Sequence, residues 1–483
     1  MQSIALFLNR LRYNSWVYGV AGTGLALVAG LLIAKMGVMG GLVVVALPIG
    51  VVTLVAVLLE PRIGLYLYLN LSFLIGASRF LEGDLQVGLG LDGVLVLTFA
   101  GTLLNAKRMA WGRLKNPAFF CVLLWLAYTI LEYFNPNSPY PPAWFYHARS
   151  FSLSWALLAL IVLVNPITRA DVWLYIKTWI VWSVLAALWG FKQQYINLEQ
   201  AELNWLAAGN AKTHVLWGQL RSFSFYSDAG QFGAEMAAAT LACLILFMME
   251  KRGLPRLVFL LLTFVLFWGF AVSGTRSALF ALVGGFAAFL VFQRRIRLIL
   301  YSAAVAIPLI CILLFTHIGD GVYQIYRIRT ALRPTQDESF LVRLENQKRL
   351  SGYLKHLPFG TGIGSSSGAG TRFTPWHWAA QIPPDSWYVQ LWIETGAVGL
   401  GIYLFVLAGI VLTGVWRIWQ LKDPWTNMLM LVLISQFVGI CVVSYSNPIL
   451  GQFPTSTIIY INSLLFASAH RWEGETKRGG ATA

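Results

Sequence analysis

The sequence predicts an all-α fold, a polytopic bundle of transmembrane helices that carries one long extramembrane loop. The first observation is composition: 58% of the 483 residues are hydrophobic and 11% are charged, whereas soluble domains carry about 25% charged residues. The second is that apolar runs long enough to cross a bilayer recur along the whole chain. We therefore expect one polytopic membrane domain over residues 1–483, with the loop 317–386 inside it and no separate soluble domain.

The apolar runs predict the individual spans. A helix crosses the hydrocarbon core with about 20 residues, so we expect about fourteen spans, or roughly twelve if the shortest runs are tilted or re-entrant. The runs lie at 17–34, 38–58, 63–78, 87–106, 117–133, 151–166, 172–190, 230–249, 257–273, 277–292, 298–316, 387–415, 426–446 and 454–470.

The basic residues predict the orientation of these spans, because cytoplasmic loops of membrane proteins are enriched in Lys and Arg. Groups of them fall in alternate gaps between the runs, whereas the other short gaps hold single basic residues. We therefore place both termini and the basic gaps in the cytoplasm, and the long loops 191–229 and 317–386 outside. The basic groups lie at 10–12, 62, 107–115, 169, 251–256, 294–297, 417–422 and 471–478.

The net charge of +15 does not indicate a nucleic-acid-binding protein, because the basic residues are distributed between apolar runs and form no single stripe. The four cysteines all lie inside apolar runs, and the six histidines lack metal-ligand spacing. We expect no disulfide framework, no metal and no cofactor.

The loop 317–386 contains an amphipathic segment and a glycine-rich run. Leu350, Tyr353, Leu354 and Leu357 recur at helical spacing, which predicts a helix lying at the outer membrane surface. The run 360–368 has the composition of a phosphate-binding loop but lacks its lysine and follows no strand. It is either a flexible hinge or a backbone segment that approaches its neighbours closely.

Two arginines on the outer side are candidate ligands for a phosphate group. Arg221 comes just before a span, and Arg276 lies in a turn too short to reach far from the hydrocarbon. A guanidinium there is costly unless it is paired or lines a wet cavity, and its planar fork suits a diphosphate. The alternative of equal weight is an arginine that extends to the interface and anchors a helix end.

The candidate acid and base groups precede or enter the later spans. Asp385 and Ser386 are either helix N-caps or, for Asp385, a general base at a membrane-edge cavity. Glu394 and Glu235 lie within spans, where carboxyl groups face the bundle interior or a cavity. His377, between two tryptophans, is an acid/base candidate or a surface histidine.

The order of three motifs resembles the O-antigen ligase/polymerase superfamily: RLENQK at 343–348, HLPFGTGIG at 356–364 and PDSWYVQLWIETGAVGL at 384–400. The resemblance implies a glycosyltransferase with a GT-C-like multi-spanning fold. It also implies a donor glycan linked to undecaprenyl diphosphate, used at the periplasmic face of the bacterial inner membrane. Arg221 and Arg276 would grip the diphosphate with help from Arg343. The family's usual histidine falls at Asp385, so the base would be this carboxylate or His377.

The expected function is metal-independent, inverting transfer of this glycan to an acceptor sugar hydroxyl, by a polymerase or a ligase of surface polysaccharide. Asp385 slightly favours the polymerase, and Ser386 and Glu394 have supporting roles. The expected partners are the donor, a glycan or lipid-linked acceptor and membrane lipids, but no nucleic acid. One alternative is a transporter of an anionic solute or lipid-linked glycan. Such a protein would contain two interrupted helices at corresponding positions of its two halves. Another is a scaffold, in which Arg221 and Arg276 need not converge.

Overall fold

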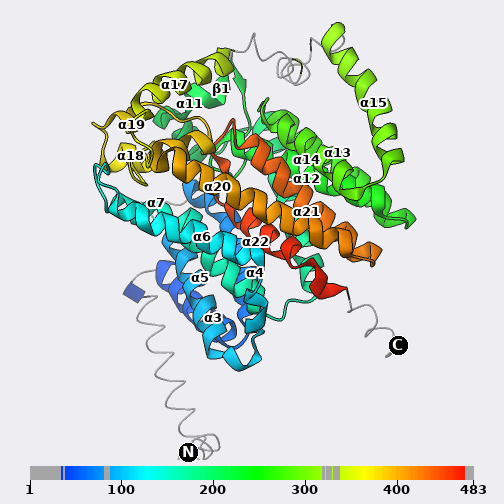
Figure 1. Cartoon of the computed structure of the whole chain (residues 1–483), viewed down its shortest axis with the longest axis horizontal. Helices are drawn as coiled ribbons and strands as arrows, with labels where there is room; N and C mark the ends of the chain where they lie inside the picture. Colours follow the sequence, from blue (N-terminus) through cyan, green and yellow to red (C-terminus); the bar gives the residue numbers. More distant parts are fainter. Residues whose placement is uncertain are drawn as a thin grey trace, which may run out of the picture.

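The computed structural model describes residues 34–35, 38–80, 87–216, 218–317, 321, 329 and 338–473. Most of the described chain is helical (Figure 1). Within it, the sole sheet is an antiparallel hairpin of two short strands, β1 (Val215–Leu216) and β2 (Gln219–Leu220). The predicted all-α polytopic fold class is therefore confirmed.

The long helices follow the predicted apolar runs, apart from the run 17–34, of which all but the last residue lies outside the described residues. Their bounds are α3 Val38–Leu59, α4 Pro61–Leu74, α5 Val87–Leu104, α6 Pro117–Leu131, α8 Ser154–Val164, α9 Arg169–Tyr195, α12 Ala229–Met249, α13 Gly253–Val272, α14 Ala278–Gln293, α15 Ile296–Phe315, α20 Trp387–Gln420, α21 Pro424–Val443 and α22 Thr455–Ala467. The six-residue helix α7 (Ala143–Ala148) precedes α8.

The two long loops carry the shorter elements. The first holds α10 (Gln200–Trp205), α11 (Ala211–His214) and the hairpin, and the second holds α17 (Glu338–Leu354), α18 (Ser367–Phe373) and α19 (Trp378–Gln381).

Seven helical stretches in the described chain are long and apolar enough to cross a membrane. They are 117–134, 143–164, 169–195, 229–249, 253–272, 387–420 and 424–443. Shorter apolar helices lie at 44–59, 88–104, 278–293 and 455–467. The chain is thus a multi-pass membrane protein, and the expected number of about fourteen crossings stays a prediction.

Contacts between loops divide them into two sets, which we call the outer-loop set and the inner-loop set. Each set contains the loops that the Lys and Arg pattern places on one side. Short helices such as α14 and α22 also run from one set to the other. Outer-set contacts join Gly76 to Phe225, Asn135 to Phe359, Arg221 to Thr275, Ser277 to Asn447 and Ser386 to Ser444. Inner-set contacts join Arg62 to Asp171, Arg169 to Asp423, Arg113 to Asn165 and Asn116 to Ser468.

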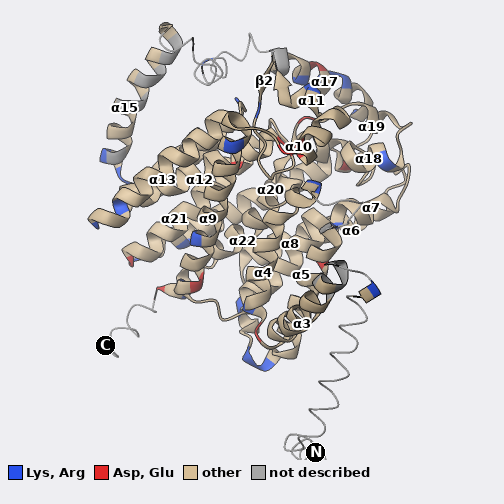
Figure 2. Cartoon of the chain, turned by 180° about the vertical axis from the view of Figure 1, so that it is seen from behind, with Lys and Arg blue, Asp and Glu red and all other residues tan. Residues whose placement is uncertain are grey.

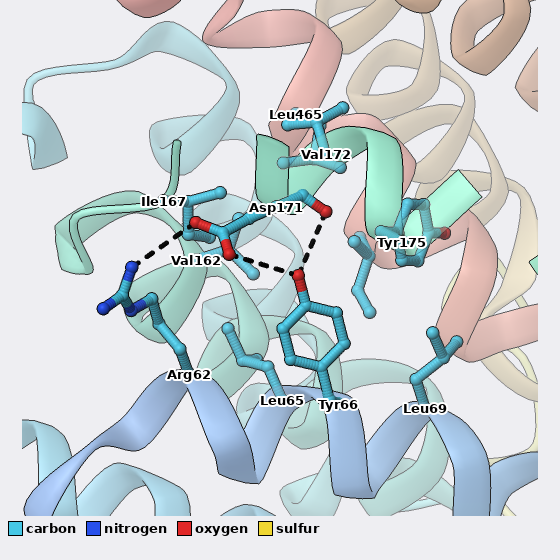
Figure 3. A pocket seen from close by; sticks show the side chains of 11 residues that line it. Arg62, Leu65, Tyr66, Leu69, Val162, Ile167, Asp171, Val172, Tyr175 and Leu465 are labelled. Carbon is cyan, nitrogen blue, oxygen red and sulfur yellow. Dashed lines mark hydrogen bonds and ion pairs between the residues drawn. The ribbon is translucent and has the colours of Figure 1, made fainter. Parts of the chain in front are cut away.

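A small, mainly apolar pocket lies within the inner-loop set, between α4 and α9 (Figure 3). Asp171 accepts hydrogen bonds there from Arg62 at 3.5 Å and from the hydroxyl of Tyr66 at 3.3 Å. The carboxylate also belongs to the N-terminal capping box of α9. These contacts connect α4 to α9, so the polar groups of this pocket have a structural role.

The 34-residue helix α20 is interrupted at Gly396, whose φ of 66° and ψ of −171° are open essentially to glycine alone. The glycine-rich run of the preceding loop fills the interruption. The N–H of Val398 donates to the carbonyl of Pro358 at 3.1 Å, and the N–H of Thr361 donates to the carbonyl of Ile393 at 2.9 Å. A Cβ atom on Gly396 would collide with the Pro358 carbonyl. The break in α20 and the glycine-rich run therefore form one interlocked unit.

The other side of the glycine-rich run contacts the loop between α6 and α7. Asn135 donates its side-chain N–H to the carbonyl of Phe359 at 2.8 Å. A Cβ atom on Gly362 would lie 2.6 Å from the Cβ of Ser138, and one on Gly364 would lie 2.8 Å from a backbone oxygen of the neighbouring loop. Residues 360–366 are all buried. Of the two predicted alternatives, the run is thus a close-approach backbone segment and not a flexible hinge.

The amphipathic segment of the loop forms the helix α17, and its apolar face contacts protein. Leu350 and Leu354 are buried in a small cluster with Val389 and Ile393 of α20 and with residues around α19. Tyr353 stacks on Trp378 with ring centroids 4.6 Å apart. The helix therefore covers α19 and the start of α20, in place of the expected position with its apolar face on lipid.

We predict that Gly396→Ala destabilises the fold, because alanine is strained by about 1–3 kcal/mol at this φ and ψ and its Cβ meets the Pro358 carbonyl. The matched control is Gly401→Ala on the same helix, where an added Cβ meets nothing within 4 Å. Thermal unfolding of both variants in the same detergent measures the difference. Equal melting temperatures would show that the interlock adds no stability.

Candidate functional site

The candidate site lies in the outer-loop set, where α12, α14 and α20 meet the two long loops. Arg221 follows the hairpin and is held by the protein at both of its terminal nitrogens. One donates to the carbonyl of Thr213 at 2.8 Å, and the other donates to the hydroxyl of Thr275 at 2.9 Å. Arg221 thus reaches the turn that contains Arg276, so these two segments lie side by side.

A third segment, 444–447 after α21, connects this turn with the start of α20. Asn447 donates to the hydroxyl of Ser277 at 2.7 Å. The N–H of Trp387, the first residue of α20, donates to the carbonyl of Ser444 at 3.0 Å. Because both contacts come from one short segment, the half-buried Arg276 and the residues just before Trp387 share one end of the bundle.

Asp385 and Ser386 differ in what they do for the helix. The hydroxyl of Ser386 is the N-cap of α20, accepting from the N–H of Val389 at 3.4 Å. Asp385 adopts φ 49°, in the left-handed region that aspartate tolerates better than most residues. Its carboxylate accepts no hydrogen bond from the described part of the chain. The capping role therefore belongs to Ser386, and the fold leaves the Asp385 carboxylate unused.

The electrostatic surroundings of Asp385 act in two directions. Partial burial raises the pKa of the carboxyl group, because desolvation disfavours its charged form, and the positive charge of Arg343 opposes the rise. Arg343 is half-buried on α17. Its guanidinium forms no hydrogen bond or ion pair with any other described residue. Since the leucines of α17 fix this helix against α20, they also fix the position from which the charge of Arg343 acts on the Asp385 carboxyl group.

His377 is placed differently. It caps the short helix α19, and its Nδ1 accepts from the N–H of Ala379 at 3.3 Å. Burial lowers the pKa of this imidazole. Within the described residues its hydrogen bonds and ring contacts are all with positions 374–380. The structure thus gives no contact between His377 and Asp385.

Glu394 lies fully buried in the first half of α20 and supports the loop. Its carboxylate accepts from the hydroxyl of Ser366 at 2.7 Å, and its second oxygen lies 3.4 Å from Nε2 of His147. The amide of Gln390 also contacts His147, at 3.0 Å. This acid therefore fastens the glycine-rich run to α20, which is a positioning role. His147 gave no signal in the sequence, because its partners are more than 240 residues away.

Two further residues that sequence reasoning did not select support the segment from Arg221 to Asp228. Arg79 lies 4.6 Å from the ring of Trp205 and donates to the carbonyl of Tyr226. Burial lowers the pKa of Arg79 to about 10. Nε2 of His214 accepts from the N–H of Ala229 at 3.2 Å, at the start of α12. Each appears in the sequence as an isolated residue, and only the fold brings the aromatic partners around it.

No group of three or more His, Cys, Asp or Glu residues in the described ranges is arranged to hold a metal ion.

Comparison with known proteins gives two findings. Residues 259–404 match the family model described as O-Antigen ligase. This range contains Arg276, Arg343, Asp385 and Glu394, whereas Arg221 lies before it. The chain is also similar to an O-antigen polymerase from Salmonella muenchen, with 27% identity over 198 residues.

That similarity covers 40% of this chain and 46% of the relative, so the match spans about half the length of each protein. The range matched by the family model contains the three motifs at 343–348, 356–364 and 384–400. The chain is thus a multi-pass membrane protein that is similar to the O-antigen ligase/polymerase superfamily over part of its length.

Proposed function

We propose that the protein is a glycosyltransferase that moves a glycan from undecaprenyl diphosphate to an acceptor sugar hydroxyl, at the periplasmic face of the bacterial inner membrane. The observation that carries the proposal is the Asp385 carboxylate. It has no structural partner in the described chain, it is coupled to the charge of Arg343, and it lies at the bundle end that holds Arg276.

The proposed reaction uses these groups directly. Asp385 accepts the proton of the acceptor hydroxyl, and the oxygen attacks the anomeric carbon as the bond from that carbon to the diphosphate oxygen breaks. Negative charge develops on the leaving diphosphate, which Arg276 and Arg221 stabilise because their positions are fixed before the reaction. A single direct displacement inverts the anomeric centre. The diphosphate is already an activated leaving group, so the reaction needs no metal or cofactor.

The remaining candidate residues have positioning roles in this proposal. Ser386 caps α20 and so fixes the residue before it, while Glu394 holds the glycine-rich run. Arg343 stabilises the ionised base. We favour a polymerase, whose acceptor is itself a lipid-linked glycan, because a carboxylate stands in the place of the family's usual histidine and because the relative is named a polymerase.

The transporter alternative is less well supported. Such a protein would contain two interrupted helices at corresponding positions of its two structural halves. Among the long helices of the described chain, non-helical backbone interrupts α20 at Gly396 alone. That break is filled by the glycine-rich run and does not line an open path.

We predict that Asp385→Asn lowers the transfer rate by about 10²–10⁴-fold, the usual contribution of a general base, and that Arg276→Ala also abolishes most of the product. The measurement is product formation from a labelled lipid-diphosphate glycan by the purified protein in liposomes. The identity of the labelled product distinguishes a polymerase from a ligase. Glu345→Gln and Arg349→Ala, two exposed changes on α17, serve as matched controls and keep full activity.

Normal product from both Asp385→Asn and Arg276→Ala, with normal folding, would contradict the proposed enzyme. If His377→Ala removes activity while Asp385→Asn keeps it, the proton acceptor is His377. Movement of the intact labelled donor across the bilayer without formation of a new glycosidic bond would instead support the transporter.

We predict that Arg343→Gln moves the acidic limb of the pH–rate profile to higher pH. The positive charge of Arg343 lowers the pKa of Asp385, so its removal raises that pKa, and the base is then protonated and inactive up to a higher pH. Arg343→Lys keeps the charge and should keep the parent pH–rate profile. Arg349→Gln removes a charge elsewhere on the same helix and is the control for a general loss of charge. An unchanged acidic limb in Arg343→Gln would show that Arg343 does not act on the base.

A further inference from the structure

A groove of about 950 Å³ opens at the opposite end of the bundle from the candidate site, within the inner-loop set. The ends of α12 and α14 and the starts of α13, α15 and α21 surround it, and Figure 2 shows Lys and Arg at the ends of α13 and α15. Its lining comprises Met248, Met249, Glu250, Lys251, Arg252, Phe289, Gln293, Arg294, Arg295, Ile296, Arg297, Tyr301, Pro424, Trp425 and Met428.

The charge of this groove is strongly positive. Five of its lining residues are cationic and one, Glu250, is acidic. The Glu250 carboxylate accepts from the backbone N–H groups of Lys251 and Arg252, at 2.9 and 3.0 Å, and forms no ion pair with a side chain. None of the ion pairs found between described residues involves a cation of the groove. Their charges are therefore not neutralised by the protein.

The floor of the groove is apolar. Phe289 and Met428 are buried, and Met248 and Trp425 lie beside them half-buried. Arg294 lies over the ring of Trp419, with 3.4 Å between its guanidinium carbon and the ring centroid. The groove thus combines cations at helix ends with an apolar surface between helices, which is the arrangement that a lipid headgroup and its acyl chains require together.

We propose that this groove binds an anionic glycerophospholipid, with Arg252, Arg295 and Arg297 on the phosphate and the acyl chains against Phe289 and Met428. A free phosphate would use the cations but would gain nothing from the apolar floor. The position fits a membrane ligand, because the groove lies between helices at the end where the sequence pattern places the cytoplasmic leaflet. This proposal does not depend on the proposed transferase reaction.

The full-length protein in a neutral detergent is titrated with phosphatidylglycerol, with phosphatidylcholine of the same acyl chains and with inorganic phosphate. Native mass spectrometry counts the bound lipid. The variant Arg252→Gln/Arg295→Gln/Arg297→Gln should weaken phosphatidylglycerol binding roughly tenfold or more, since each cation near an anionic headgroup contributes to affinity. Replacing the same three arginines by lysine keeps the charge and should retain most of the binding.

The matched control is Lys107→Gln/Arg108→Gln/Lys115→Gln, which removes three exposed cations from another loop of the inner-loop set, outside the groove. This variant should bind phosphatidylglycerol like the parent, and thermal melting checks that all variants are folded. Equal loss in both glutamine variants, or no preference for phosphatidylglycerol over phosphatidylcholine, would overturn the proposal. Displacement of the lipid by inorganic phosphate at equal concentration would also overturn it, because the ligand would then be a free anion.

Discussion

The interruption of α20 at Gly396 is the constraint on which the outer end of the molecule depends. In a transmembrane helix, backbone groups freed by a break must find partners within the protein, because lipid offers none. Here Pro358 and Thr361 supply them, so the loop after α17 is fastened to the bundle by backbone contacts that glycine alone permits. The loop and the first half of α20 are consequently joined as one body. That body carries the paired charges of the candidate site, whose mutual position would otherwise depend on an extramembrane segment of about seventy residues.

The two carboxylates on this body, Glu394 and Asp385, differ in the role that the fold leaves to each. Glu394 is fully buried; one of its oxygens accepts a hydrogen bond from Ser366 and the other lies 3.4 Å from Nε2 of His147, so it holds the loop in place. Asp385 lies at the tip, with a left-handed backbone and no hydrogen bond from the described chain, because Ser386 already caps the helix. A partly buried carboxylate without a partner costs stability. The proposed reaction explains this loss of stability, because a carboxylate that already accepts hydrogen bonds from the protein would be a poorer proton acceptor.

Much of the architecture follows from patterns that the sequence displays locally. The apolar runs predicted the helices, because a helix that crosses a bilayer needs a long apolar stretch. The alternation of Lys and Arg predicted on which side each loop lies, and the loops assigned to one side contact one another in the structure. The details of the site depend on long-range contacts instead. Neither the glycine run nor Gly396 reveals alone that the two interlock. Adjacent Asp385 and Ser386 compete for one capping role that only the backbone geometry assigns. Leucines at helical spacing in α17 fit lipid or protein equally well, and the cluster with Val389 decides for protein.

If Asp385 stands where members of the similar superfamily carry a histidine, the charge balance of the proposed reaction changes. A histidine base is neutral before it takes the proton and cationic afterwards. An aspartate is anionic first and neutral afterwards, so in the resting site it competes with the diphosphate for the nearby guanidinium groups. Arg343 relieves this competition by stabilising the carboxylate from α17. Once the aspartate has taken the proton, it is neutral and no longer attracts the guanidinium groups. This happens as the leaving diphosphate gains negative charge, so the arginines can then stabilise the diphosphate. Either base therefore makes the site more positive by one charge during transfer, but the aspartate does so only if a separate arginine keeps it ionised beforehand.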